Sequence, residues 1–211
     1  MAAVAAGVTV LLWASAFIGI RSAGRSFGPG ELALFRLAVG TVALGVFMVI
    51  RRERLPRGRD LLLVATAGVA WFAVYNVALN AGERRVDAGT AAMLVNVGPL
   101  LIVLFAGLLL REGFPRALSV GLLVSFAGAV VVGWATSRGG ATSLVGVGLC
   151  LLAAVTSAAG VIAQKPALAR VSALSATFTG CAIGLLVLLP FTGGLVRTLR
   201  TAPAGAIWTV A

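Results

Sequence analysis

The chain is a succession of apolar runs, each about as long as a membrane-spanning helix. A transmembrane helix needs roughly 20 apolar residues to cross the hydrocarbon layer. Seven runs reach this length, and only the second contains a charge, at Arg36. The pattern therefore predicts an all-α integral membrane protein. The runs are 2–20, 32–50, 61–82, 88–110, 117–137, 139–164 and 171–196, and an eighth, 201–211, begins and stops at the last residue.

Composition and charge placement agree with a lipid environment. Hydrophobic residues make up 60% of the 211 residues and charged residues 11%, whereas soluble domains have about 25% charged residues. The net charge of +11 suggests a nucleic-acid partner, but nucleic-acid modules cluster their basic residues on one face. Here 16 of the 17 Lys and Arg residues lie between the apolar runs or at their ends. We therefore expect the lipid bilayer, and no nucleic acid, as the partner.

The segment 51–60 carries five arginines, more than any other loop. Loops rich in Lys and Arg stay on the cytoplasmic side. This rule predicts a multi-pass protein of the cell (plasma or inner) membrane with a cytoplasmic N-terminus. With that orientation, the cytoplasmic loops hold nine basic residues and the opposite loops seven. The orientation therefore depends mainly on this one loop.

The order of apolar runs and basic turns repeats after 144 residues. Because the first unit has five helices, the second unit enters the membrane from the opposite side. Such inverted repeats are typical of secondary transporters, whose substrate sites lie between the repeats. We predict a first unit at 1–137 and a partial second unit at 138–211. The residues that coincide at this offset include Ala14 and Ala158, Ile18 and Ile162, Arg21 and Lys165, Gly40 and Gly184, and Leu44 and Leu188.

Four segments of the chain match the motifs of a known family of membrane proteins. Residues 11–21, LLWASAFIGIR, look like its first-helix motif, and residues 34–37, LFRL, resemble its second-helix arginine motif. Residues 88–112 resemble its fourth helix, with a mid-helix Pro99 and a terminal acid. Residues 120–133 resemble its Gly-rich fifth helix. These segments resemble the EamA family of the drug/metabolite transporter superfamily, and the resemblance covers the first unit from end to end and about half of a second.

The resemblance implies ten helices in two inverted five-helix repeats. It also implies export or exchange of small polar metabolites, amino acids among them, or of drugs. Sliding the two units over each other places Ala211 opposite Ala67, just inside the third helix of a unit. We therefore expect a C-terminally truncated member, with a complete first repeat and a second repeat cut off in its third helix. The chain would then hold seven spans and a stub of the expected ten.

Arg36, the one charge within the apolar runs, is the strongest single candidate for substrate binding. A charge inside a transmembrane helix is costly and usually faces a cavity or a partner. Arg36 lies five residues after Glu31, about 7 Å below the membrane surface at 1.5 Å per residue. Substrate contact or gating is one interpretation. The other is that the guanidinium snorkels toward the surface and pairs with Glu31.

Tyr75, Asn76 and Asn96 are further substrate-binding candidates at a similar depth. Tyr75 and Asn76 lie near the end of the third run, and Asn96 lies eight residues into the fourth; Asn80 extends the polar stripe. An amide in hydrocarbon must find a hydrogen-bond partner. These side chains therefore either line a polar cavity together with Arg36 or bond to neighbouring helices.

Trp13, Ser15 and Pro99 complete the predicted substrate-binding set. Trp13 and Ser15 lie near the middle of the first run, too deep for the aromatic belt of a membrane surface. Packing inside the bundle is the alternative for the tryptophan. Pro99 breaks the backbone hydrogen bonding at mid-membrane. Such a break marks either a binding site or hinge or a plain kink.

Small residues recur at every fourth position of the fifth run and form one row along the helix. Such rows let helix backbones approach closely in lipid. The resemblance implies that this helix packs against the tenth helix of complete family members. We therefore expect the row to contact either the missing C-terminal helices or a second copy of the chain, as a homodimer. The row consists of Ala117, Gly121, Ser125, Ala129 and Gly133.

Residues suited to catalysis or metal binding are few. The chain has no His, and its six acidic residues all lie at run ends or in loops. No metalloprotease, serine hydrolase or phosphate-loop motif occurs. Cys150 and Cys181 fall in separate runs and are best explained as packing residues. We predict a membrane transporter without cofactor or metal, not an enzyme. The alternative is a non-transporting membrane fragment or an assembly module.

Overall fold

The computed structural model describes residues 7, 23–24, 26–109, 113, 116–136, 143–203, 205 and 207, and the regular structure within them is helical throughout. The predicted all-α architecture is therefore confirmed for this part of the chain. Helices of the described residues that are long and apolar enough to cross a membrane are Pro29–Arg51, Gly58–Glu83, Gly89–Leu109, Leu144–Ala169 and Ala173–Thr201.

These five helices coincide with the second, third, fourth, sixth and seventh predicted runs. The fifth run corresponds to α7, Arg116–Thr136, a helix of 21 residues. Apart from single residues, the first run and the end of the stub lie outside the described residues.

Local chemistry determines both ends of α2, Pro29–Arg51. Gly28 is the N-cap, and the Oε2 atom of Glu31 accepts a hydrogen bond from the Gly28 N–H at 3.0 Å. Pro29 occupies the first turn, where its missing N–H costs nothing. The helix ends because Arg52 adopts the left-handed conformation, with φ at 51°, which turns the chain away from the helix axis.

The third span is not the single regular helix that the sequence predicts. It consists of α3, Gly58–Ala67, then the π-helical segment η1, Gly68–Val74, and then α4, Tyr75–Glu83. A π-helix joins residues five apart instead of four. The side chain of Asn76 supports this wider segment, because its Nδ2 donates to the carbonyl of Phe72 at 2.9 Å and to that of Trp71 at 3.4 Å.

The fourth span is interrupted close to Pro99. It consists of α5, Ala88–Val95, and α6, Val97–Leu109, which meet at a turn at Asn96. Pro99 has no N–H with which to bond the carbonyl four residues earlier, so the helical ladder cannot continue through this point. The start of α5 is capped by Asp87, whose Oδ1 accepts from the Thr90 N–H at 3.0 Å.

Two serines start the sixth and seventh spans. Ser143 caps α8, Leu144–Gln164, and Ser172 caps α9, Ala173–Leu188. The described helix of the sixth span therefore begins later than the run 139–164 suggests. After α9, the 3-10 segment η3, Leu189–Phe191, contains Pro190 and leads into α10, Thr192–Thr201. The short segment η2, Ala167–Ala169, lies in the turn between α8 and α9.

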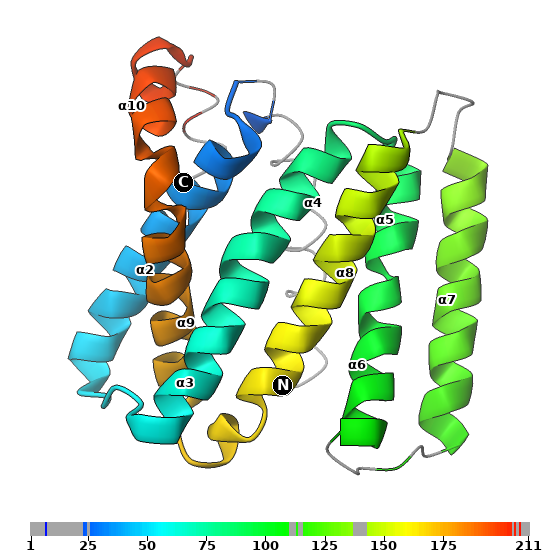
Figure 1. Cartoon of the computed structure of the whole chain (residues 1–211), viewed down its shortest axis with the longest axis horizontal. Helices are drawn as coiled ribbons and strands as arrows, with labels where there is room; N and C mark the ends of the chain where they lie inside the picture. The colour runs from blue at the N-terminus through cyan, green and yellow to red at the C-terminus, as the bar shows by residue number, and fades with distance from the viewer. Residues whose placement is uncertain are drawn as a thin grey trace.

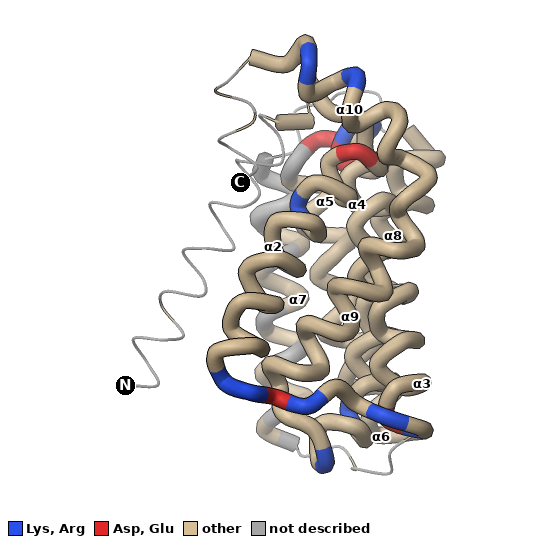
Figure 2. The backbone as a smooth tube through the Cα atoms, turned by 90° about the vertical axis from the view of Figure 1, so that its left-hand side faces the viewer, with Lys and Arg blue, Asp and Glu red and all other residues tan. Residues whose placement is uncertain are grey.

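The helices stand side by side and alternate in direction (Figure 1). In that view α2 and α9 lie on one side, α3–α4 and α8 in the middle, and α5–α6 and α7 on the other side. Lys, Arg, Asp and Glu gather at the two ends of the described bundle, and the length between the ends is almost free of them (Figure 2). This distribution is the one expected for a bundle that crosses a hydrocarbon layer.

Glycines let the third span pass close to α8 and α9. A Cβ added to Gly68 would lie 2.8 Å from the carbonyl oxygen of Gly180 in α9. A Cβ added to Gly160 in α8 would lie 2.6 Å from the Cβ of Trp71. In lipid the hydrophobic effect does not drive helices together, and small residues at such crossings favour association because they allow close van der Waals packing. The third span is therefore packed between α8 and α9.

Candidate functional site

Arg36 is the described charged residue that lies well inside a span. It is half-buried on α2, and it interacts electrostatically with Tyr75 and Glu83 of α4. The two helices also touch near the start of α2, where the Nδ2 of Asn80 donates to the Pro29 carbonyl at 3.0 Å. The structure therefore brings two of the predicted site residues, Arg36 and Tyr75, to one helix pair.

Glu31 has other partners than the Arg36 guanidinium considered from the sequence. Its Oε2 accepts from the backbone N–H of Gly28 at 3.0 Å and from the Oγ1 of Thr198 at 2.8 Å. Thr198 belongs to α10, so this carboxylate joins the start of α2 to the end of the seventh span. Glu31 therefore caps the start of α2 and links it to α10.

One face of α4 carries the polar groups of this region. Tyr75, Asn76, Asn80 and Glu83 follow one another at helical spacing, and Asn80 is 2% exposed. Among the described residues, the Oδ1 of Asn80 is a buried acceptor with no hydrogen-bond partner. A buried polar atom of this kind is costly unless something fills its bonding capacity.

Glu83 was missed by the sequence reasoning. It stands at the end of the run and reads as a surface residue, yet it is only partly exposed and acts electrostatically on Arg36, Tyr75 and Cys150. Its place seven residues after Asn76 and three after Asn80 is the signal that puts it on the same helix face. Arg36 on α2 and Glu83 on α4 are therefore charges of opposite sign that act on each other across this helix pair.

Asn96 and Pro99 lie on a different helix pair. Both are exposed, and the Nδ2 of Asn96 donates to the Ala92 carbonyl of its own helix at 2.8 Å. The helices that carry them, α5 and α6, pack against α8 and α7, whereas α2 packs against α9 and α4. The described contacts thus do not join Asn96 or Pro99 to Arg36. Trp13 and Ser15 lie outside the described residues.

The predicted row of small residues lies on α7. Its first two members, Ala117 and Gly121, are exposed, and a Cβ on Gly121 would meet no atom within 4 Å. The side chains of the other members, Ser125, Ala129 and Gly133, are outside the described part. α7 itself packs against α5. Within the part of the chain that the structure describes, Ala117 and Gly121 are therefore left open on the surface of α7.

The helical architecture and the charge-free middle of the bundle define a multi-pass helical membrane protein. Comparison with known proteins gives the family. The EamA-like transporter family matches residues 1–134, more than half of the chain. The chain therefore belongs to the EamA-like transporter family.

Several relatives are similar to most of this chain. A probable terminal-alkyne amino-acid exporter of Streptantibioticus cattleyicolor is 37% identical, over 94% of this chain and 66% of its own length. The uncharacterized transporter YdfC of Bacillus subtilis is 34% identical, over 94% of this chain and 65% of its own length. The pseudopaline exporter CntI of Pseudomonas aeruginosa is 27% identical, over 81% of this chain and 59% of its own length.

The chain spans about two thirds of the length of the first two of these relatives. One crystal structure of a protein with 20% sequence identity matches the fold with a TM-score of 0.67, over 94% of this chain and 74% of that chain. At this identity the likeness concerns the fold alone.

Proposed function

We propose that the protein exports or exchanges a small metabolite, amino-acid-like or drug-like, by alternating access. The observation that carries the proposal is the 37% identity to a probable amino-acid exporter over 94% of this chain. The name of a more distant relative, a pseudopaline exporter, also refers to export of a small molecule. The relatives are named as transporters or exporters, and this supports a transporter in place of an enzyme.

Arg36 would contact an anionic group of the substrate. Its half-buried guanidinium lies on α2 opposite α4, and a charge held at this depth needs a function or a partner. Tyr75, Asn80 and Glu83 supply donors and acceptors on the facing helix. We keep Trp13, Ser15, Asn96 and Pro99 as proposed site residues on helices that would border the same pathway. Asn76 has the weaker claim, because its amide bonds to its own helix.

The two units, 1–137 and 138–211, would be inverted repeats that rock against each other. The N-caps of α2 and α9, Gly28 and Ser172, are 144 residues apart, which is the offset between the two predicted units. Two contacts between the units agree as well. Thr198 donates to Glu31, and Ser175 donates to the carbonyl of Arg54 at 2.7 Å.

Subtracting 144 from Ser175 gives position 31, and subtracting it from Thr198 gives position 54. Each contact is therefore the image of the other when the units are exchanged, as a two-fold relation between them requires. One contact lies at each end of the antiparallel α2–α9 pair. The pattern supports a pseudo-symmetric arrangement of the described helices.

The charges at the two ends support an orientation. Among the described residues outside Arg36, eight basic residues lie at the end that contains the 51–60 loop, and four lie at the opposite end. The positive-inside rule then puts the 51–60 loop and the N-terminus in the cytoplasm. We propose an inner or plasma membrane location on this basis.

A second candidate function is a membrane-embedded assembly module. The observation that favours it is the exposed start of the small-residue row on α7, at Ala117 and Gly121. Such a row would suit a partner helix, from a second copy or from further helices.

Efflux from cells tests the proposed transport. Cells that express the protein are loaded with labelled amino acids, and the rate of release is compared with that of cells expressing Arg36→Ala and Arg36→Lys. We expect faster release with the wild type, loss of that gain in Arg36→Ala, and partial recovery in Arg36→Lys. Membrane levels of each variant are measured as the control. Release that does not differ between wild type and empty cells argues against transport of these substrates. Equal release by wild type and Arg36→Ala removes Arg36 from the site.

A further inference from the structure

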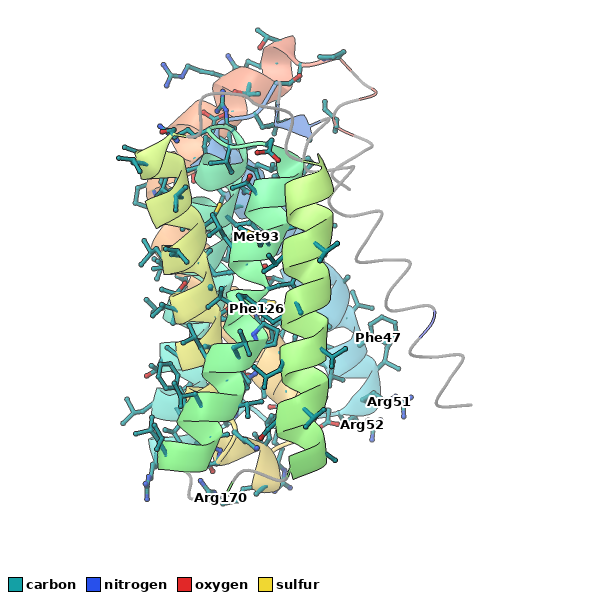
Figure 3. The ribbon with its side chains drawn as sticks, turned by 90° about the vertical axis from the view of Figure 1, so that its right-hand side faces the viewer. Phe47, Arg51, Arg52, Met93, Phe126 and Arg170 are labelled. Carbon is teal, nitrogen blue, oxygen red and sulfur yellow. The ribbon has the colours of Figure 1, made fainter. Side chains whose placement is uncertain are left out.

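The loop between α2 and α3 concentrates positive charge that the packing and the proposed transport site do not use. We call Arg51–Asp60 the arginine loop; it holds Arg51, Arg52, Arg54, Arg57 and Arg59, all of them exposed. Arg51 and Arg52 lie at the same end of the bundle as Arg170 (Figure 3). The arginine loop runs from the last residue of α2 to the first turn of α3. It therefore lies at the level where a bilayer places its headgroups.

The two carboxylates of the arginine loop already have partners. Asp60 receives two hydrogen bonds from the Nε of Arg170, at 3.0 and 3.1 Å, and forms an ion pair with the Nη2 of the same side chain. Glu53 accepts from the Oγ of Ser172 at 2.9 Å. In the part of the chain that the structure describes, no ion pair is recorded for the five arginines of the loop. Their charge is thus available to an anion from outside.

The same contacts hold the arginine loop in place. Arg170 and Ser172 belong to the turn between α8 and α9, and Ser175 of α9 donates to the backbone carbonyl of Arg54 at 2.7 Å. An anion that binds the arginines therefore meets a surface whose backbone is already fixed, which reduces the entropy cost of binding.

Apolar side chains border this charge. Ile50 is 67% exposed at the end of α2, and Leu55 is 56% exposed within the loop. Leu62 is exposed by 69% on the first turns of α3. A free phosphate ion would gain nothing from these side chains, but an acyl chain below a phosphate group would. The combination favours a lipid.

At the opposite end of the bundle, the described basic residues are divided between two segments. The described basic residues of that end are Arg84, Arg85, Arg197 and Arg200, and its described acidic residues are Glu31, Glu83 and Asp87. Among its described residues, the end with the arginine loop has eight basic residues and two acidic ones, and five of the eight lie within one stretch of ten residues. Polybasic segments at the membrane surface attract anionic lipids.

We propose that the arginine loop is a binding site for the headgroups of anionic phospholipids. Guanidinium groups bind phosphate oxygens with paired hydrogen bonds. Because the arginine loop is joined to the turn between α8 and α9, a bound lipid also stabilises the contact between the two parts of the chain at this end. The proposal does not depend on the proposed transport activity.

Lipid retention by the purified full chain tests the proposal. The protein is mixed in detergent with phosphatidylglycerol or with phosphatidylcholine, and the lipid that stays bound is counted by native mass spectrometry. The test variant is Arg54→Gln/Arg57→Gln/Arg59→Gln, whose side chains make no recorded hydrogen bond among the described residues. The matched control is Arg84→Gln/Arg197→Gln/Arg200→Gln, which removes the same charge from the other end.

We expect the wild type and the control to retain phosphatidylglycerol in preference to phosphatidylcholine. The test variant should lose about fivefold in retention for each arginine removed, the factor that corresponds to about 1 kcal/mol per basic residue at a membrane surface. Thermal unfolding in phosphatidylcholine checks that each variant is folded, and the single variant Arg57→Gln replaces the triple one if it is not. Retention of phosphatidylglycerol by the test variant at the wild-type level overturns the proposal. Equal retention of the two lipids by the wild type overturns it as well.

Discussion

Replacement of Gly68 by alanine tests the close packing of the third span against α9. The added Cβ would lie 2.8 Å from the Gly180 carbonyl oxygen and 3.0 Å from the Cβ of Ile183. Contacts this short do not occur, so one of the two helices must move. The first obstacle is backbone and not the end of a flexible side chain, which makes relief costly. Gly180 itself differs, because a Cβ there would meet the ring of Phe72 at 2.8 Å, and a ring can turn.

The expected loss follows from this geometry. Overpacking of a well-packed interior costs about 1–3 kcal/mol. For a chain of this size, each kcal/mol corresponds to roughly 2–4 °C in melting temperature. Gly68→Ala should therefore melt roughly 2–12 °C below the wild type. The control is Gly148→Ala in α8, where a Cβ would meet no atom within 4 Å. It should be neutral, or more stable by up to about 1 kcal/mol, because alanine favours a helix.

The assay is thermal unfolding of the purified protein in detergent, followed by tryptophan fluorescence for wild type and both variants at one detergent concentration. If Gly68→Ala melts at or above the wild-type temperature while Gly148→Ala is unchanged, the close packing of Gly68 against Gly180 is contradicted. The third span would then not approach α9 as closely as the structure has it.

Three further results are expected. Asp87→Ala removes the cap of α5 and should lower stability by about 1 kcal/mol, measured by thermal unfolding, whereas Asp87→Asn should keep most of it. Hydrogen bonds from Thr90 hold the pKa of Asp87 below its usual value, so its stabilisation is present above the ordinary carboxyl pKa. This stabilisation is lost as the pH falls through the lowered pKa. The melting temperature of the wild type should therefore fall more steeply with decreasing pH than that of Asp87→Asn, and an equal pH dependence of the two proteins contradicts this. Asn76→Ala should destabilise the π-helical segment by roughly 0.5–1.5 kcal/mol, seen as faster amide exchange confined to that span. Asp60→Arg and Arg170→Asp should each speed proteolysis of the loop between α2 and α3, and the double variant should restore the wild-type rate.

The sequence predicted the spans because hydrocarbon imposes a length and a near absence of charge. The ends of α2 can also be predicted from local residues. Pro29 and Glu31 are typical of a helix start, and the arginines after Ile50 end the apolar run. The interruption near Pro99 follows from a missing N–H. Pro190 gives a comparable signal inside the seventh run, and the 3-10 segment there could have been expected from it.

Other features depend on partners that are far away in the sequence. The π-helical segment lies between Gly160 and Gly180, so its shape is set by two other helices. The contact of Asn80 with Pro29 joins residues 51 positions apart, and the pair of Asp60 with Arg170 joins residues 110 positions apart. Neither can be found from periodicity alone. For the candidate site, the depth of Arg36 and Tyr75 was predicted from the sequence, but the electrostatic effect of Glu83 on both was not.

Transport by the purified protein in proteoliposomes tests the central proposal most directly. Vesicles that contain wild type, Arg36→Ala or no protein are preloaded with unlabelled amino acids, and entry of labelled amino acid by exchange is followed over time. We expect faster exchange in the wild-type vesicles than in the other two kinds, and exchange by Arg36→Ala close to that of protein-free vesicles. Exchange by wild type that equals the protein-free background for amino acids and for drug-like cations and anions would contradict it.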